Sequence, residues 1–214
     1  LLIYNPSDKS FVQYLREENS ENTISENRIY AVYEDSKGNY WAGSHRKGLN
    51  KIDRKIGKIS HYNFVSRNRK TVSNNFVLSV CEDHEGDIWV GTYSNGLYKI
   101  KKGNSKPIKY SVEKNMTGKL VSKILEDTNN NLWISTNGSG IFKYNREKDN
   151  FENFRHNPMN ITGLNTDKIW SIMEDHEGMI WFGTISSGIN IFDPTKNKFK
   201  RLTKRINDKN NELG

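Results

Sequence analysis

A segment of eleven residues that occurs four times constrains the fold of this 214-residue chain more than any other feature. Each copy begins with Glu-Asp and carries a tryptophan at its eighth position, and the copies occupy residues 34–44, 82–92, 126–136 and 174–184. The tryptophans at 41, 89, 133 and 181 are therefore spaced by 48 (89−41), 44 (133−89) and 48 (181−133) residues. Repeats of this length with one tryptophan each are typical of β-propeller blades.

Each repeat contains four short segments with the pattern of β-strands. The first alternates apolar residues with period two, as in Ile29-Ala31-Tyr33, and an Asp-x-x-Gly turn follows it. Asn130 replaces the glycine in the third repeat, and both residue types tolerate the left-handed backbone of a tight turn. The second strand carries the tryptophan, the third begins after a further glycine, and the fourth is expected at the outer edge. Pro107 falls in the fourth strand of the second repeat, where an edge position tolerates the missing N–H.

The repeats predict an all-β fold, a β-propeller fragment of four complete four-stranded blades plus a half blade. Residues 1–15 match the second half of a repeat, so we expect the chain to begin within a blade. The aromatic residues that recur in each repeat are expected to pack between adjacent blades. The expected division is the second half of a blade at 1–19, blades at 20–66, 67–113, 114–158 and 159–206, and a linker to a missing blade at 207–214.

Composition narrows the class of protein only a little. A hydrophobic fraction of 34% and a mean hydropathy of −0.84 are low, but the apolar residues recur at fixed places, which argues against disorder. The one cysteine, Cys81, excludes an internal disulfide and stands in an apolar strand column, which predicts a buried small hydrophobic residue. A formal net charge of +8 favours polyanionic partners. No basic stripe with a recognisable motif is present, so we expect no direct binding of nucleic acid.

The repeat E-D-x-x-G-x-x-W-x-G-T, followed by Gly, a short apolar strand and Asp/Asn-Pro, resembles the two-component regulator propeller repeat. The departures are Ala42, Asn130-Asn131, Ser135 and Pro107. The resemblance implies the periplasmic sensor portion of a Bacteroides-type hybrid two-component system, with seven-bladed propellers, and a membrane helix, histidine kinase and DNA-binding regulator beyond this segment. It implies a membrane association only through those missing parts.

The loops between the second and third strands are the best candidates for ligand binding. They emerge on one face of a propeller together with the linkers between blades, and they differ most among the repeats, as binding loops do in repeat proteins. Their amide, hydroxyl, aromatic and cationic groups suit a polyhydroxylated, acidic ligand. The candidate residues are His45, Arg46, Lys47, Tyr93, Ser94, Asn95, Asn137, Ser139, Ser186 and Ser187, with Arg67 and Arg69 from a linker.

The sequence patterns that could suggest a metal site or a catalytic site have simpler structural explanations. His84 and His176 share a column beside aspartates, but they belong to separate blades without a second ligand at a metal-site spacing, so we expect no metal and no cofactor. The Glu-Asp pairs recur in every blade, whereas acid–base catalysis needs one asymmetric site. The acidic turn faintly resembles the Asp box of sialidase-type propellers, although two residues separate Asp83 from Gly86 where that box has one.

Three functions remain open at this point. The first is a noncatalytic periplasmic sensor that recognises an oligosaccharide to control transcription of glycan-utilisation genes, and the basic net charge favours an acidic oligosaccharide. The second is a propeller enzyme of the sialidase or polysaccharide-lyase kind, and the third is a scaffold or dimerisation surface. An open arc of blades leaves sheet faces and edges uncovered, so we also expect self-association.

Overall fold

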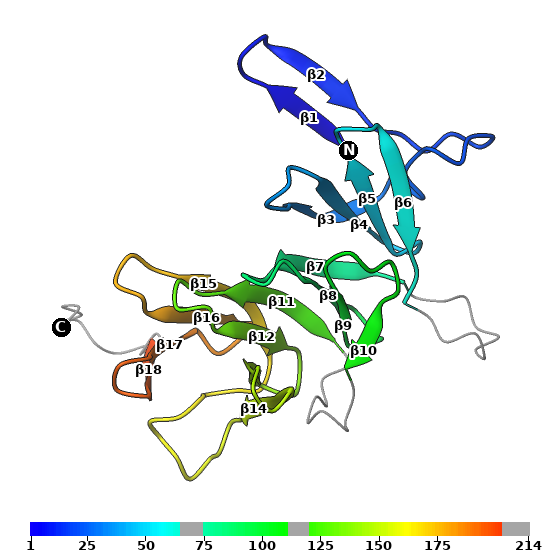
Figure 1. Ribbon diagram of the computed structural model, residues 1–214. Helices are drawn as coiled ribbons and strands as arrows, with labels where there is room; N and C mark the ends of the chain where they lie inside the picture. The colour runs from blue at the N-terminus through cyan, green and yellow to red at the C-terminus, as the bar shows by residue number, and fades with distance from the viewer. Residues whose placement is uncertain (65–74, 111–119, 203–214) are drawn as a thin grey trace.

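The computed structural model describes residues 1–64, 75–110 and 120–202, and these residues form strands and turns without a helix (Figure 1). The first two strands form a hairpin, β1 (Leu2–Asn5) with β2 (Ser10–Gln13). The other strands are β3 (Ile29–Glu34), β4 (Tyr40–Ser44), β5 (Leu49–Asp53), β6 (Lys58–Tyr62), β7 (Val77–Glu82), β8 (Ile88–Thr92), β9 (Leu97–Ile100), β10 (Ile108–Tyr110), β11 (Val121–Glu126), β12 (Leu132–Thr136), β13 (Ile141–Asn145), β14 (Asn150–Phe154), β15 (Ile169–Glu174), β16 (Ile180–Thr184), β17 (Ile189–Asp193) and β18 (Lys198–Leu202).

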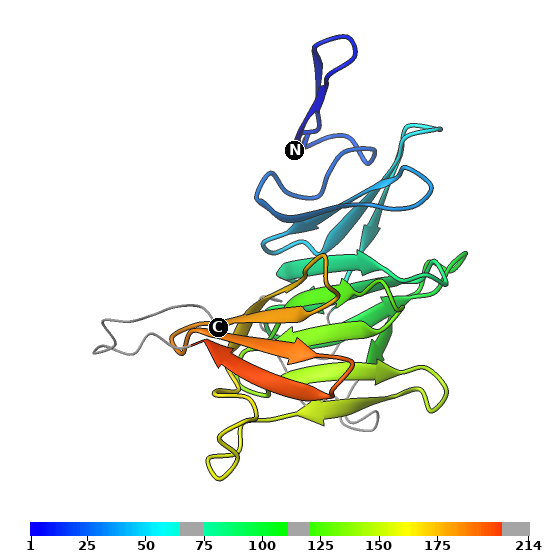
Figure 2. The same ribbon diagram turned by 90° about the vertical axis from the view of Figure 1, so that its left-hand side faces the viewer.

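The strands from β3 onward form four antiparallel sheets of four strands, each in the order of the sequence. The sheets are β3–β6, β7–β10, β11–β14 and β15–β18, which we call blades 1 to 4, and β1–β2 is a separate two-stranded sheet. The all-β prediction of four complete blades and a half blade is confirmed. In Figure 2 the blades lie face to face in a fan, with the β1–β2 hairpin at one end.

The first strand of each blade lies at the inner edge of the fan. β3 packs against β7, β7 against β11, and β11 against β15, whereas the fourth strands point outward (Figure 1). Two of these contacts are too close for a side chain on the second strand. A Cβ on Gly43 would lie 2.6 Å from Cγ1 of Val77, and one on Gly91 would lie 2.6 Å from Cγ1 of Val121. Glycine in the second strand therefore lets the next blade approach.

The hydrophobic core consists of three clusters, each between two neighbouring blades. Trp41, Trp89 and Trp133 are at most 3% exposed, and the ring of Trp89 lies 4.9 Å from that of Tyr144 in the next blade. Trp181 in blade 4 is only partly buried, because no described blade covers its face. The prediction that the aromatic columns pack between blades is confirmed.

A single aspartate organises each turn between the first and second strands. Oδ1 of Asp127 accepts hydrogen bonds from the backbone N–H groups of Asn129 (3.0 Å) and Asn131 (2.8 Å). Its Oδ2 accepts the indole N–H of Trp133 at 2.8 Å. The same three bonds occur at Asp35, Asp83 and Asp175. The predicted backbone contacts are confirmed, and the tryptophan column owes its orientation to the same carboxylate.

Neighbouring blades are joined by the glutamate that precedes this aspartate. Glu82 accepts hydrogen bonds from the N–H and hydroxyl of Ser36 in the preceding blade, at 2.6 and 3.0 Å. Glu174 binds Thr128 in the same way, and Glu126 binds Nδ1 of His84 at 2.7 Å. The repeated Glu-Asp pair is therefore a structural unit, in which one acid shapes the turn and the other holds the neighbouring turn.

The structure corrects one strand boundary and explains two departures from the repeat. Pro107 was predicted within the fourth strand, but it directly precedes β10, which has three residues because the proline cannot donate to the ladder. Ser135, which replaces glycine, is buried and hydrogen bonds to Ser122 at 2.9 Å. Asn130 adopts a left-handed φ of 62°, as the turn requires. Cys81 is buried in the core, as predicted.

Candidate functional site

The loops between the second and third strands share one hydrogen-bonded backbone. The first loop residue donates its N–H to the residue before the first strand, as in Tyr93 to the carbonyl of Phe76 at 2.9 Å. The hydroxyl of Thr92 at the end of β8 donates to the carbonyl of Gly96 and accepts the N–H of Asn95. The same bonds recur in the other blades, through Ser44, Thr136 and Thr184. The loop backbone is therefore constant, while its side chains differ between blades.

On blades 1 and 2 a continuous row of rings is formed by these loops together with residues at the start of the first strands. The rings of His45 and Phe76 lie 4.8 Å apart, and Phe76 stacks on Tyr93 at 5.5 Å with an interplanar angle of 16°. Tyr30 lies 4.7 Å from Phe76 and 5.6 Å from His45. Tyr30 and Tyr93 are exposed, at 61% and 43%. We call these four residues the aromatic row.

Two cations flank the aromatic row. Arg46 and Lys47 follow His45 directly, are exposed, and form no ion pair with another described residue. The N–H of Arg46 is held by the carboxylate of Glu26 at 2.8 Å, which fixes the backbone and leaves the guanidinium available. Nδ1 of His45 is buried without a hydrogen-bond partner, the only such side-chain atom among the residues described. The row thus combines apolar faces with cationic groups at its side.

The other predicted site residues are distributed more widely along the same face. Ser94 and Asn95 continue the blade 2 loop, Asn137 and Ser139 belong to blade 3, and Ser186 and Ser187 belong to blade 4. The loops of blades 3 and 4 have the same backbone, but no ring–ring contact is present at the residues of these two loops. Arg67 and Arg69 lie outside the described residues. The structure therefore brings together His45, Arg46, Lys47 and Tyr93, and whether any of these residues binds a ligand stays a prediction.

Sequence reasoning missed two members of the aromatic row. Phe76 precedes the first strand of blade 2, at the position that Arg28, Leu120 and Lys168 occupy in the other repeats. Tyr30 belongs to the first strand, in a column where Trp170 is the corresponding residue of blade 4. Attention to the most variable loops left these positions out, although aligning the four repeats shows that each varies as much as the loops do.

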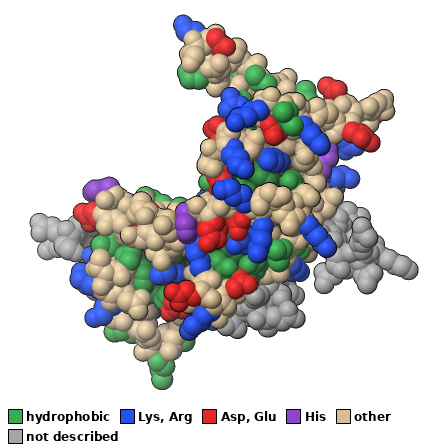
Figure 3. Space-filling view, in the orientation of Figure 1, with side chains coloured by type: hydrophobic (Ala, Val, Ile, Leu, Met, Phe, Trp, Pro, Cys, Tyr) green, Lys and Arg blue, Asp and Glu red, His purple; other side chains and the backbone are tan. Residues whose placement is uncertain are grey.

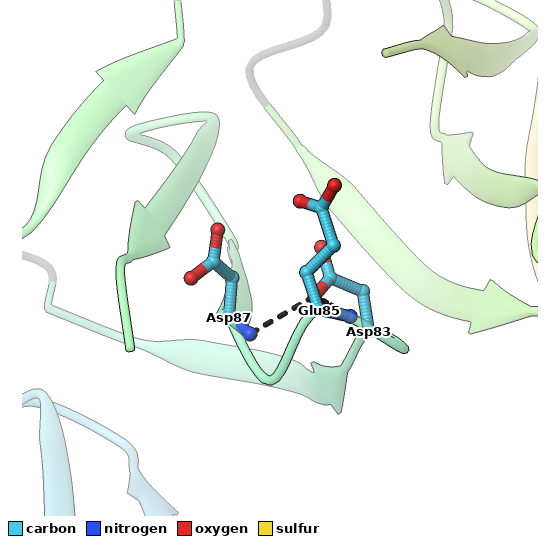
Figure 4. Close-up of side chains that lie close together, drawn as sticks. All are labelled: Asp83, Glu85 and Asp87. Carbon is cyan, nitrogen blue, oxygen red and sulfur yellow. Dashed lines mark hydrogen bonds between the residues drawn. The ribbon is translucent and has the colours of Figure 1, made fainter. Parts of the chain in front are cut away.

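The opposite face carries the acidic turns and contains one group of carboxylates. Oxygens of Asp83, Glu85 and Asp87, all on the turn between β7 and β8, lie within 4.8 Å of one another (Figure 4). Cations already neutralise this group. Nζ of Lys99 lies 2.8 Å from Oδ2 of Asp87, and Nη1 of Arg146 lies 3.1 Å from Oδ2 of Asp83. Because two cationic side chains occupy the carboxylates, the arrangement favours a structural ion network over a metal site.

The ion network also fixes Lys99 between two blades. Lys99 is 4% exposed, and its ammonium lies 4.8 Å from the ring centre of Trp89 and 5.6 Å from that of Tyr144. The Arg146 guanidinium also contacts Glu126, the partner of His84. His84 is thus part of an inter-blade contact, while His176 on blade 4 is almost fully exposed beside Glu177.

The described residues hold no helix with the length and apolar character of a membrane span. The family model of the two-component regulator propeller matches residues 23–46, 71–94, 115–138 and 163–186, one segment in each blade. The search of curated proteins found no match.

Several solved propellers share the fold. The extracellular domain of BT3049 from B. thetaiotaomicron, described as a hybrid two-component system, superposes with a TM-score of 0.72 at 22% identity over 95% of this chain. That of BT4673 from the same organism gives 0.70 at 22% identity over 96%. Virginiamycin B lyase from Staphylococcus aureus gives 0.67 at 18% identity over 94% of this chain and 62% of its own.

The chain spans 25% and 28% of the length of the two B. thetaiotaomicron domains. At these identities the superpositions establish the fold alone. The assignment of the repeats rests on the four matched segments, each of which contains one Glu-Asp turn and the tryptophan strand that follows it. This chain therefore contains four two-component regulator propeller repeats.

Proposed function

We propose that this chain is a noncatalytic sensor segment of a hybrid two-component system, located in the periplasm, and that it recognises an oligosaccharide with the loops of blades 1 and 2. The observation that carries the proposal is the constant loop backbone that presents different side chains in each blade. Such a division between fixed scaffold and varied surface is what a repeat protein uses for recognition.

The aromatic row is the part of this surface that best fits a sugar. Tyr30 and Tyr93 expose ring faces next to polar loop groups, and sugar rings present C–H faces together with hydroxyls. Arg46 offers a planar set of donors that matches a carboxylate or sulfate, because a guanidinium binds such groups through two hydrogen bonds. A saccharide that carries an acidic group would engage both features.

Signalling requires that the ligand bind two arrangements of the receptor with different affinities. The blades themselves are held together by buried rings, ion pairs and the glutamate contacts, so we expect them to move as one body. On this proposal, ligand binding changes how the propeller sits against its partner domains, and control of glycan-utilisation genes follows from kinase and regulator domains elsewhere in the parent protein.

The test is calorimetric titration of this chain with acidic and neutral oligosaccharides. We expect saturable binding without turnover, and a loss of about tenfold or more in affinity for Tyr93→Ala. The scale for this loss is the contribution of a nucleic-acid base stacked on an aromatic side chain, on the order of 1–3 kcal/mol. Ile185→Ala is the matched control, because Ile185 has the same place in the blade 4 loop and is also exposed. A triple alanine variant of His45, Arg46 and Lys47 separates the charge from the ring contribution.

Other outcomes would reject the proposal. Turnover of an oligosaccharide would support the enzyme alternative, for which the geometry offers little. The shortest histidine–carboxylate contact among the described residues, His84 with Glu126, takes the place of Ser36–Glu82 and Thr128–Glu174 in a structural contact. Equal effects of Tyr93→Ala and Ile185→Ala would remove the aromatic row from the site. Absence of binding across the whole panel would favour a scaffold.

A further inference from the structure

A cavity of about 300 Å³ opens between blades 1 and 2 on the face of the acidic turns, opposite the loops between the second and third strands. Four lysines line it, which we call the lysine pocket: Lys37 from the turn after β3, Lys51 from β5, and Lys101 and Lys102 from the turn after β9. Asp35 and Glu82 are the carboxylates that share the lining, and Trp41 and Ile88 are among its apolar residues. Figure 3 shows Lys and Arg side chains gathered over these first two blades.

The next interface shows what the same repeat positions do elsewhere. Counted from the turn aspartate and the loop glycine, Lys37, Lys51 and Lys102 correspond to Glu85, Lys99 and Arg146. Between blades 2 and 3, Glu85 lies 3.9 Å from Lys99 and 3.6 Å from Arg146. Lys99 also pairs with Asp87, and Arg146 with Asp83, so both cations are neutralised at that interface.

In the lysine pocket a lysine replaces that glutamate. Lys37 is a third cation where its counterpart is an acid, and none of the four lysines forms an ion pair with another described residue. The ammonium of Lys51 instead lies over the ring of Trp41, 5.5 Å from its centre. The side chain of Lys102 lies along Gly86 of the same blade, where an added Cβ would meet its Nζ at 3.3 Å, and both residues line the cavity.

The two carboxylates of the lining are already bound to other donors. Asp35 accepts the indole N–H of Trp41 and two backbone N–H groups. Glu82 accepts both donors of Ser36. Four lysines and two carboxylates leave a net charge of +2 (4 − 2) in the cavity. The lining therefore carries an excess of positive charge, which an anion in the cavity would neutralise.

We propose that the lysine pocket binds an oxyanion ligand, either a free dianion or a sulfate, phosphate or carboxylate group on a larger molecule. The volume lies at the lower end of the range of ligand pockets, so the group that enters is small. Lysine ammonium groups on flexible stems bind such oxygens as point charges. The site lies on the opposite face from the aromatic row, and this proposal does not depend on the sensor proposal.

The test measures sulfate binding at low ionic strength by calorimetry and by the rise in melting temperature that a native-state ligand produces. Wild-type protein should bind sulfate saturably. Lys51→Ala should weaken binding about tenfold, as expected for one charge-assisted contact. Lys143→Ala is the matched control, because Lys143 has the same strand position in blade 3 and lies 5.3 Å from the ring centre of Trp133.

Lys37→Glu is the sharper variant, since it restores the acid that the next interface has. It should abolish the sulfate-dependent rise in melting temperature while the melting temperature without sulfate stays equal or increases, which shows that the variant is folded. If a sulfated disaccharide binds more tightly than free sulfate and more tightly than the unsulfated disaccharide, the ligand is a sulfate group on a larger molecule. If free sulfate and the sulfated disaccharide bind with equal affinity, the ligand is a free anion. No saturable sulfate binding, or equal losses for Lys51→Ala and Lys143→Ala, would overturn the proposal.

Discussion

The aspartate of the turn should be a main determinant of blade stability, and Asp127→Ala tests this. Asp127 is 4% exposed and Trp133 is fully buried, so the substitution leaves an indole N–H without access to water. An unsatisfied buried donor costs about 1–3 kcal/mol, and hydrogen bonds to a charged group contribute about 1.5–3 kcal/mol. The backbone N–H of Asn129 lies near the surface and regains water. We therefore expect a loss of about 3–5 kcal/mol in the free energy of unfolding.

The assay is urea denaturation followed by circular dichroism, because fluorescence would change with any tryptophan substitution. A double-mutant cycle with Trp133→Phe isolates the indole contribution, since that change removes the donor whose partner is lost. The expected coupling energy is about 1–3 kcal/mol.

Asp175→Ala is the internal control. Asp175 makes the same three hydrogen bonds, but Trp181 is only partly buried, so water can replace the carboxylate. Its loss of stability should be smaller than that of Asp127→Ala. Equal losses at the two aspartates, or a coupling energy near zero between Asp127 and Trp133, would refute the reasoning.

Four further predictions follow from particular contacts. Burial opposes the charge of Asp35, but hydrogen bonds from Asn39 and Trp41 outweigh it and lower its pKa from 3.8. Burial likewise opposes the charge of Asp87, and the hydrogen bond from Lys99 helps to lower its pKa from 3.8. The Thr195 hydroxyl lowers the pKa of Asp193 to about 2. Folded pKa values below the unfolded ones add stability that is complete above about pH 4 and lost as pH falls toward 2, so the melting temperature should drop across that window and stay level from pH 5 to 7 if these acids are responsible. Burial raises the pKa of the Cys81 thiol to about 11, so a thiol reagent at pH 8 should modify it only after unfolding, and rapid labelling of the native protein would contradict this. Gly91→Ala should destabilise by about 1–3 kcal/mol because the new methyl meets Val121 at 2.6 Å, whereas Gly163→Ala, which meets only the flexible side chain of Asn160, should have little effect in the same urea titration. The partly exposed face around Trp181, Ile191 and Phe199 should promote self-association at high concentration, and light scattering that shows a monomer throughout would contradict it.

The fold could be predicted because the residues that determine it recur. Each blade repeats the turn aspartate, the left-handed Gly or Asn, and the tryptophan at fixed spacings, so four independent copies point to the same hairpin. What joins the blades could not be predicted in the same way. The contact of Glu82 with Ser36 links residues 46 positions apart, and nothing in either residue alone indicates the other. Such pairs become visible only when the distance between repeats is known in space.

The residues of the candidate sites could be predicted from the sequence only in part. The loop residues His45 and Tyr93 were found because they vary within a constant scaffold, yet the ring that connects them, Phe76, precedes a strand and was overlooked. The lysine pocket was not predicted for a different reason, since its residues belong to turns and a strand whose other features are structural. Lys37 stands where the other repeats have Glu85, Asn129 and Glu177, and only this copy places a cation in that column. In a repeat protein, a reversal of charge at a position of the repeat therefore indicates a candidate binding site as much as variation in a loop does. The other copies show which contacts that position makes when its role is structural.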